Sequence, residues 1–281
     1  CLKEHMTFTN LMTLMPQGED HFVAAASPDK GARTFGGQFL AQTLRAAQAT
    51  VDGTRAVNSL HAYFLRPGDP YIETQMRVER VREGRSFCSR QVVAAQNNKE
   101  LFRVNISLQV PDETPVYQAE SPPEVPPPES VSTTYVDFAL PLMGKDSWAG
   151  SNRPIDILYI NPPTTRGVPI TEAQLMWLKL RHPIPDDAAL HAAGLAYLSD
   201  ATLVDHVMLP HGLRWQDSDF TGASLDHCMW FHAPCRADEW LLFVQNVEAT
   251  GRGRGLARGR FYTRDGILAA TCMQEGLMRW A

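Results

Sequence analysis

One carboxylate in this 281-residue sequence stands among apolar neighbours. Asp200 lies near the end of the segment DDAALHAAGLAYLSDATL (186–203), whose pattern predicts a helix. At 100° per residue it falls on the face of small apolar side chains that includes Ala189, Ala193 and Ala196. Burying an unpaired carboxylate there is costly, and burial raises a carboxyl pKa, which suits a general base. The alternative is that Asp200 only ends the helix and points to solvent.

A primary amide is placed in a similar way near the end of the chain. Gln274 alternates with Ala270 and Cys272 in ILAATCMQEG (267–276), so it shares an apolar strand face. In the first half of the chain, Gln109 alternates with polar residues instead and needs no explanation. Gln274 is therefore either functional or a buried amide that satisfies a strand end.

The elements that must position these side chains occur twice. SLHAYFLRP (59–67) and LDHCMWFHAP (225–234) are nearly the same phrase, and each belongs to a series of one helix and several alternating strands. The first series has a helix at 35–51 and strands at 71–81, 86–96 and 101–110, with a turn at 97–98. The second has a helix at 186–203 capped by Asp186, strands at 239–250, 255–263 and 267–278, a hairpin turn at 265–266, and an earlier strand at 174–182.

A proline-rich stretch separates the two series. PDETPVYQAESPPEVPPPES (111–130) holds seven prolines and cannot form the interior of a sheet or a helix. The sequence predicts an N-terminal unit over 6–110, a linker over 111–150 and a C-terminal unit over 151–281. Each unit is expected to wrap an antiparallel sheet around a central helix, which gives an α+β fold.

Composition excludes several classes of protein. With 44% hydrophobic and 20% charged residues the chain can bury a core, and a net charge of −5 offers no general attraction to nucleic acid. No apolar run reaches the roughly 20 residues needed to span a bilayer. Five cysteines without a CxxC pair suggest a reducing compartment, and the final Arg279-Trp280-Ala281 is not a peroxisomal signal, so the cytoplasm is expected.

Several longer motifs resemble a known family. FGGQ (35–38), FLRPG (64–68), LSDATL (198–203), DHCMWFHAP (226–234), EWLLF (239–243) and GRFYTRDGILAATCMQEGLMR (259–279) are similar to the acyl-CoA thioesterase II family of double-hotdog enzymes. The resemblance runs from about Thr34 to Arg279. It implies a double hotdog, in which two fused units replace a homodimer and one copy keeps the chemistry while the other drifts.

The resemblance also implies a site. The family's catalytic Asp, Ser or Thr, and Gln fall on Asp200, Ser224 and Gln274, although the pattern around Ser224 alone predicts only a turn or cap residue. The implied reaction is hydrolysis of fatty acyl-CoA, in which Asp200 takes a proton from water while Ser224 and Gln274 hold the water or orient the Asp. The resemblance implies neither a cofactor nor a metal. It also implies that the chain forms a homo-oligomer.

Two other functions and one other mechanism remain open at this point. A hotdog enoyl-CoA hydratase needs an Asp and a His five residues apart with Asn-Pro between, whereas His206 follows Asp200 by six and Asn-Pro is absent. A non-catalytic acyl-CoA-binding protein would be expected to have lost one of the three site residues. A covalent acyl-serine at Ser224 is disfavoured because no GxSxG elbow surrounds it.

Overall fold

The computed structural model describes residues 7–27, 33–144, 147–215, 217 and 220–280. The expected first residue of the N-terminal unit, Met6, and the last residue of the chain lie outside these ranges.

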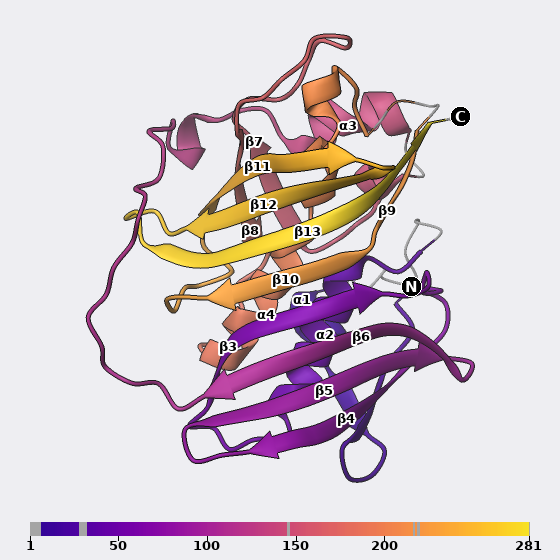
Figure 1. Ribbon diagram of the computed structural model, residues 1–281, viewed down its shortest axis with the longest axis vertical. Helices are drawn as coiled ribbons and strands as arrows, with labels where there is room; N and C mark the ends of the chain where they lie inside the picture. The colour runs from indigo at the N-terminus through magenta and orange to yellow at the C-terminus, as the bar shows by residue number, and fades with distance from the viewer. Residues whose placement is uncertain (1–6, 28–32, 145–146, 216, 218–219, 281) are drawn as a thin grey trace.

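Within the described residues, thirteen strands form one antiparallel sheet that curves across the molecule (Figure 1). Twelve follow the order β1-β2-β4-β5-β6-β3-β10-β13-β12-β11-β8-β7, and β9 pairs with β13 beside this path. Their bounds are β1 Leu14–Pro16, β2 His21–Ala24, β3 Ala56–Phe64, β4 Thr74–Glu83, β5 Phe87–Gln96, β6 Lys99–Gln109, β7 Ile155–Tyr159, β8 Gln174–Leu180, β9 Phe220–Ser224, β10 Asp226–Phe231, β11 Leu241–Gly251, β12 Arg254–Tyr262 and β13 Leu268–Trp280.

The two repeated phrases of the sequence lie side by side at the centre of this sheet. β3 and β10 run antiparallel, and His61 lies opposite Cys228. On one side of this pair are the strands of the first series, and on the other side are those of the second (Figure 1). The α+β double hotdog expected from the sequence is confirmed.

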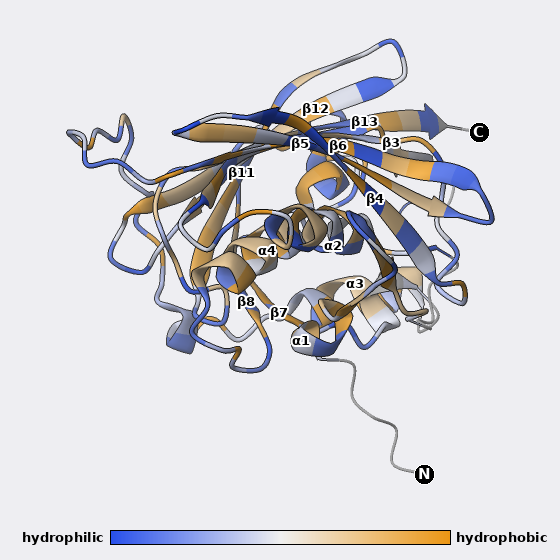
Figure 2. Ribbon diagram, turned by 90° about the horizontal axis from the view of Figure 1, so that it is seen from below, coloured by the Kyte–Doolittle hydropathy of each residue, from blue (hydrophilic) through white to orange (hydrophobic). Residues whose placement is uncertain are grey.

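Two central helices, α2 (Gly36–Gln48) and α4 (Ala188–Ser199), fill the concave side of the sheet (Figure 2). They pack against one another and both are largely buried, because α4 in particular is apolar on nearly every side. The expected cap of α4 was wrong by one residue. Asp187 accepts from the Ala189 N–H at 2.9 Å, while Asp186 bonds to Arg236.

The remaining helices are short. They are α1 Phe8–Leu11, η1 Pro128–Ser130, α3 Tyr135–Met143, η2 Trp148–Gly150, η3 Leu203–His206 and η4 Leu209–His211. α3 lies inside the stretch 111–150 expected as a linker, and Thr134 and Asp137 form a capping box at its start. The domain boundaries stay a prediction.

One hydrophobic core extends through both units and fixes the start of α2 against the end of α4. The ring of Tyr197 on α4 makes edge contacts with Phe8 and Phe35, at centroid distances of 5.4 and 5.1 Å. Phe35 immediately precedes α2. Residues of the first series therefore hold the end of the helix that carries Asp200.

Candidate active site

Asp200 is the C-cap residue of α4, where the chain leaves the helix. Its carboxylate turns toward the sheet, and its Oδ1 accepts a hydrogen bond from Gln274 Nε2 at 2.7 Å. Asp200 thus ends the helix, as the alternative interpretation predicted, but its side chain does not simply point to solvent. It bonds to Gln274, the other polar residue that the sequence places on an apolar face.

The N-terminus of α2 lies against the same carboxylate. Phe35 is the N-cap of α2 and offers no side-chain cap, and the Gly37 N–H donates to Asp200 instead. A Cβ added to Gly36 would lie 2.6 Å from Asp200 Oδ2, so only glycine allows this approach. An acid of the second unit therefore caps the central helix of the first.

Burial determines the electrostatics of Asp200. Loss of solvation raises its pKa from 3.8 to about 6, against the hydrogen bonds from Gln274 and Gly37 and the charge of Arg153, which lower it. The carboxylate is therefore mostly ionised at pH 7, but it is a stronger base than a solvated one.

Ser224 is the last residue of β9 and is half-buried. It lies opposite Gly276 on β13, two residues beyond Gln274, so both side chains project from the same face of the sheet. No hydrogen bond to Asp200 or Gln274 joins it among the described residues. The structure brings Asp200 and Gln274 into contact and leaves Ser224 nearby on the same face.

A second buried polar network lies beside this group. The Tyr135 hydroxyl donates to Asp205 at 2.6 Å, and burial raises the pKa of Asp205 to about 7, with the charge of Asp200 adding to the rise. The two nitrogens of His206 bond to Tyr159, at 2.6 Å, and to Gln245. His206 is thus committed on both sides, which leaves no ring nitrogen for the Asp–His chemistry of a hydratase.

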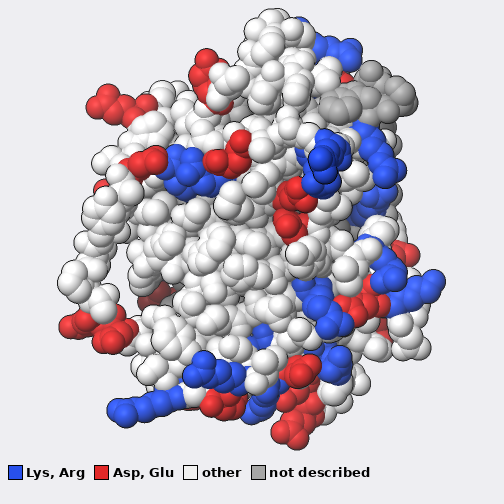
Figure 3. All heavy atoms as spheres, viewed as in Figure 1, with Lys and Arg blue, Asp and Glu red and all other residues white. Residues whose placement is uncertain are grey.

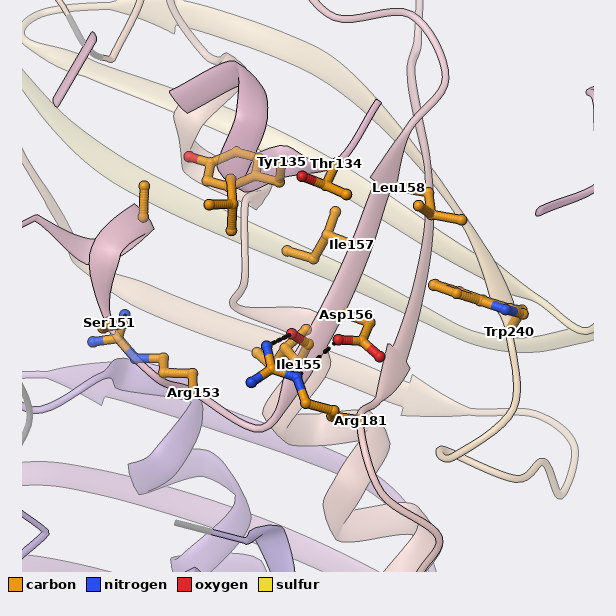
Figure 4. Close-up of a pocket in the computed structure, with 12 residues that line it drawn as sticks. Thr134, Tyr135, Ser151, Arg153, Ile155, Asp156, Ile157, Leu158, Arg181 and Trp240 are labelled. Carbon is orange, nitrogen blue, oxygen red and sulfur yellow. Dashed lines mark hydrogen bonds and ion pairs between the residues drawn. The ribbon is translucent and has the colours of Figure 1, made fainter. Parts of the chain in front are cut away.

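A cavity of about 390 Å³ opens between α3 and the edge strand β7 (Figure 4). The rings of Tyr135 and Trp240 and the side chain of Ile157 form part of its wall, and Arg153 and Arg181 lie toward one end. Two of its lining residues connect it to the site. Tyr135 bonds to Asp205, and Arg153 packs over the Phe35 ring at the start of α2, 5.0 Å from its centroid.

Comparisons with known proteins match this architecture in both halves. The model of the acyl-CoA thioesterase N-terminal domain matches residues 24–109, and that of acyl-CoA thioesterase matches residues 160–277. Human acyl-coenzyme A thioesterase 8 is 38% identical over 96% of this chain and 88% of its own. The chain belongs to the acyl-CoA thioesterase family.

Further relatives match this chain over nearly all of their length. Acyl-CoA thioesterase 2 of Haemophilus influenzae is 34% identical over 94% of both chains. The crystal structure of the acyl-CoA thioesterase II TesB2 from Mycobacterium marinum is 33% identical, covers 98% of both chains and superposes with a TM-score of 0.81. The family expected from the motifs is confirmed.

Sequence reasoning missed several residues that surround Asp200 and Gln274. Gly36 and Gly37 were visible in the FGGQ motif, but nothing local revealed that they meet the end of a helix over 160 residues away. His227 lies behind Gln274, and Arg153 and Asp205 adjust the electrostatics of Asp200 and its surroundings. Their positions depend on strand pairing and helix packing, which no single segment encodes.

Proposed function

We propose that this chain hydrolyses fatty acyl-CoA to a free fatty acid and CoA by water attack, with Asp200 as the general base. The family supplies the substrate class, and the observation that carries the mechanism is the hydrogen bond between Asp200 and the buried Gln274 at the N-terminus of α2. A base with a pKa of about 6 is ionised at neutral pH and still accepts a proton readily.

The proposed reaction has two steps. Asp200 takes a proton from a water molecule held about 3 Å from the thioester carbonyl carbon, and the oxygen bonds to that carbon. The tetrahedral intermediate then breaks its C–S bond, and the CoA thiolate receives the proton from Asp200. The fatty acid and the CoA thiol are released and the ionised carboxylate of Asp200 is regenerated, so the cycle needs no cofactor.

Gln274 and Ser224 are proposed to supply geometry. The Gln274 amide holds Asp200 Oδ1, while Oδ2 lies at the N-terminus of α2. The Ser224 hydroxyl, on the same face of the sheet, is placed to orient the attacking water or the substrate. Among the described hydrogen bonds, none joins the Ser224 hydroxyl to a histidine that could act as its base. This favours an orienting role for Ser224 over that of a nucleophile.

The cavity beside α3 is proposed to take part of the acyl chain. Ile155, Ile157, Leu158 and Trp240 give it an apolar wall, and Tyr135 and Arg153 link it to the surroundings of Asp200. Ala149 also lines it and is buried, so Ala149→Phe should shift the preferred acyl chain to fewer carbons. An unchanged chain-length profile in a folded Ala149→Phe variant would place the acyl chain elsewhere.

Release of free thiol from a series of acyl-CoAs, acetyl to palmitoyl, tests the proposed function. The wild type should show a maximum at some chain length, and Asp200→Asn should reduce kcat by about 10²- to 10⁴-fold at that length. Unchanged turnover in Asp200→Asn would exclude this base. Saturable binding of acyl-CoA without thiol release in the wild type would favour the alternative of a non-catalytic acyl-CoA-binding protein.

The chain is also proposed to associate with a second copy through the outer face of the sheet. Charged side chains lie around the rim of this face, and few stand over its centre, where β3, β10 and β13 run (Figure 3). Tyr63 is 64% exposed there, and Trp230 packs edge-on against His61. Light scattering should report a dimer for the wild type and a monomer for Tyr63→Asp; a monomeric wild type would exclude the association.

Location in the cytoplasm stays a prediction. No helix in the described ranges is long and apolar enough to cross a membrane.

A further inference from the structure

The amide of Gln274 has two ends, and Asp200 accounts for one of them. Its Nε2 donates to Asp200 Oδ1, so its Oε1 points away from the carboxylate. Gln274 is completely buried, and Oε1 has no hydrogen bond of ordinary geometry within the described part of the chain. Because an unpartnered buried carbonyl oxygen is costly, a donor is expected at this end.

His227 stands at that end of the amide. β10 and β13 pair with Cys228 opposite Met273, so the next residue along each strand brings His227 beside Gln274. His227 is also completely buried, its Nδ1 lacks a hydrogen bond of ordinary geometry, and the Gln274 amide acts on its pKa. Two unsatisfied polar atoms therefore face each other behind the catalytic pair.

The other nitrogen of His227 indicates where its proton lies. His227 Nε2 is 2.9 Å from Ser199 Oγ, and the Ser199 hydroxyl donates to the Ala196 carbonyl oxygen at 2.8 Å. Burial lowers the pKa of His227 to about 4, so the ring is neutral near pH 7 and has a single N–H. A proton on Nε2 would leave the lone pairs of Nδ1 and Gln274 Oε1 in opposition. A proton on Nδ1 satisfies both. The Ser199 hydroxyl then turns from the Ala196 carbonyl oxygen to donate to Nε2, so the number of hydrogen bonds is unchanged and the opposition of lone pairs is removed.

We propose that His227 is a positioning residue that fixes the orientation of the Gln274 amide. Its Nδ1–H donates to Gln274 Oε1, and the resulting chain of donors runs from Ser199 through His227 and Gln274 to Asp200. This role rests on the proposed function of Asp200 as the base. Without His227, the amide is free to turn over and present Oε1 to the carboxylate, which opposes ionisation of Asp200.

Two substitutions of His227 separate this role from simple packing. In His227→Asn the side-chain nitrogen occupies the place of Nδ1, whereas in His227→Gln the amide reaches only toward the place of Nε2 and Ser199. We expect His227→Asn to keep kcat within about threefold, and His227→Gln to lose about tenfold or more, as for a lost buried hydrogen bond. His227→Gln should also move the acid limb of kcat to higher pH with KM little changed.

A matched control uses an imidazole–hydroxyl bond of the same kind at the surface. His211 Nε2 lies 2.7 Å from Thr250 Oγ1 and is exposed, so His211→Asn should leave kcat, KM and the pH profile unchanged. Equal losses in His227→Asn and His227→Gln, or wild-type kinetics in both, would overturn the positioning role.

Nitrogen-15 NMR of the imidazoles in the resting wild-type protein gives a test that does not depend on turnover. The expected result is a neutral His227 with its proton on Nδ1, and a proton on Nε2 would overturn the proposal. Active Asp200→Asn together with an Nδ1–H tautomer would refute the proposed base and leave the hydrogen-bond chain intact, so the two failures can be told apart.

Discussion

The side-chain amide of Gln274 and the carboxylate of Asp200 meet at 2.7 Å although they lie 74 residues apart in the sequence. One ends a central helix and the other lies in the middle of a strand, and each looks misplaced among the apolar residues of its own element. Their contact explains both anomalies. It also places the Asp200 carboxylate against the N-terminus of α2, which belongs to the other unit.

The pH dependence of turnover should report the ionisation of Asp200. The proposed mechanism requires an ionised Asp200, and burial raises the pKa of this residue to about 6, so kcat should fall as the pH drops below about 6. Gln274→Leu removes a hydrogen bond that lowers this pKa, so its acid limb should lie at higher pH. Stopped-time assays of thiol release between pH 4.5 and 8.5 measure the acid limb of the wild type and that of Gln274→Leu. Gln109→Leu, at the end of β6 in the first unit, serves as the control and should leave the limb in place.

Ionisation of Asp200 should lower folding stability, whereas the same ionisation should raise activity. Its pKa is higher in the folded protein than in the unfolded chain, so the folded state binds more protons between about pH 4 and 6 and loses stability as the pH rises through that window. Asp200→Asn removes this cost, and we expect it to raise the free energy of unfolding by about 1–3 kcal/mol at pH 8. Urea denaturation at pH 8 and pH 4 checks this, since the advantage should largely disappear at pH 4. Lower stability of the variant at pH 8 would contradict the burial argument.

A methyl group at Gly36 should damage the site selectively. The added Cβ would lie 2.6 Å from Asp200 Oδ2 and 2.8 Å from the Phe64 ring, so the carboxylate or the start of α2 must shift. We expect Gly36→Ala to lower kcat by about 10- to 100-fold, because a displacement of about 1 Å at reacting groups has effects of this size. Steady-state kinetics with one acyl-CoA measures it. Gly53→Ala is the matched control, since no heavy atom lies within 4 Å of its new Cβ. Equal effects of the two substitutions would exclude a specific role of the Gly36 contact.

The role of Ser224 can be separated from that of a nucleophile. If its hydroxyl only orients water or substrate, Ser224→Thr should keep most of the activity, and Ser224→Ala should lose about tenfold in kcat through one hydrogen bond. Thr221→Ala, an exposed position on the same strand, should have no effect. Accumulation of an acyl-enzyme in rapid-quench mass spectrometry, together with complete loss of turnover in Ser224→Ala, would instead identify a covalent mechanism.

The sequence by itself determined the fold class and the identity of the anomalous residues. Alternation in segments such as 101–110 and 267–276 is a local property, so the longer strands of both units could be located from their own residues, whereas β1, β2, β7 and β9 were missed. The turn at Asn97 and Asn98 was equally local, since both residues adopt a positive φ. Asp200 and Gln274 stood out for the same reason, because a polar side chain on an apolar face is visible in a single element.

Only the tertiary structure decided what these residues touch. α3 was not predicted because the prolines that precede it indicated a linker over the whole of 111–150. The cap of α4 is Asp187 and not Asp186, because Asp186 binds Arg236, 50 residues away. The approach of Gly36 to Asp200 and of His227 to Gln274 follows from the packing of α2 on α4 and the register of β10 on β13. Such contacts join segments distant in the chain, and their free energy comes from burial and hydrogen bonding that exist only once the whole core has formed.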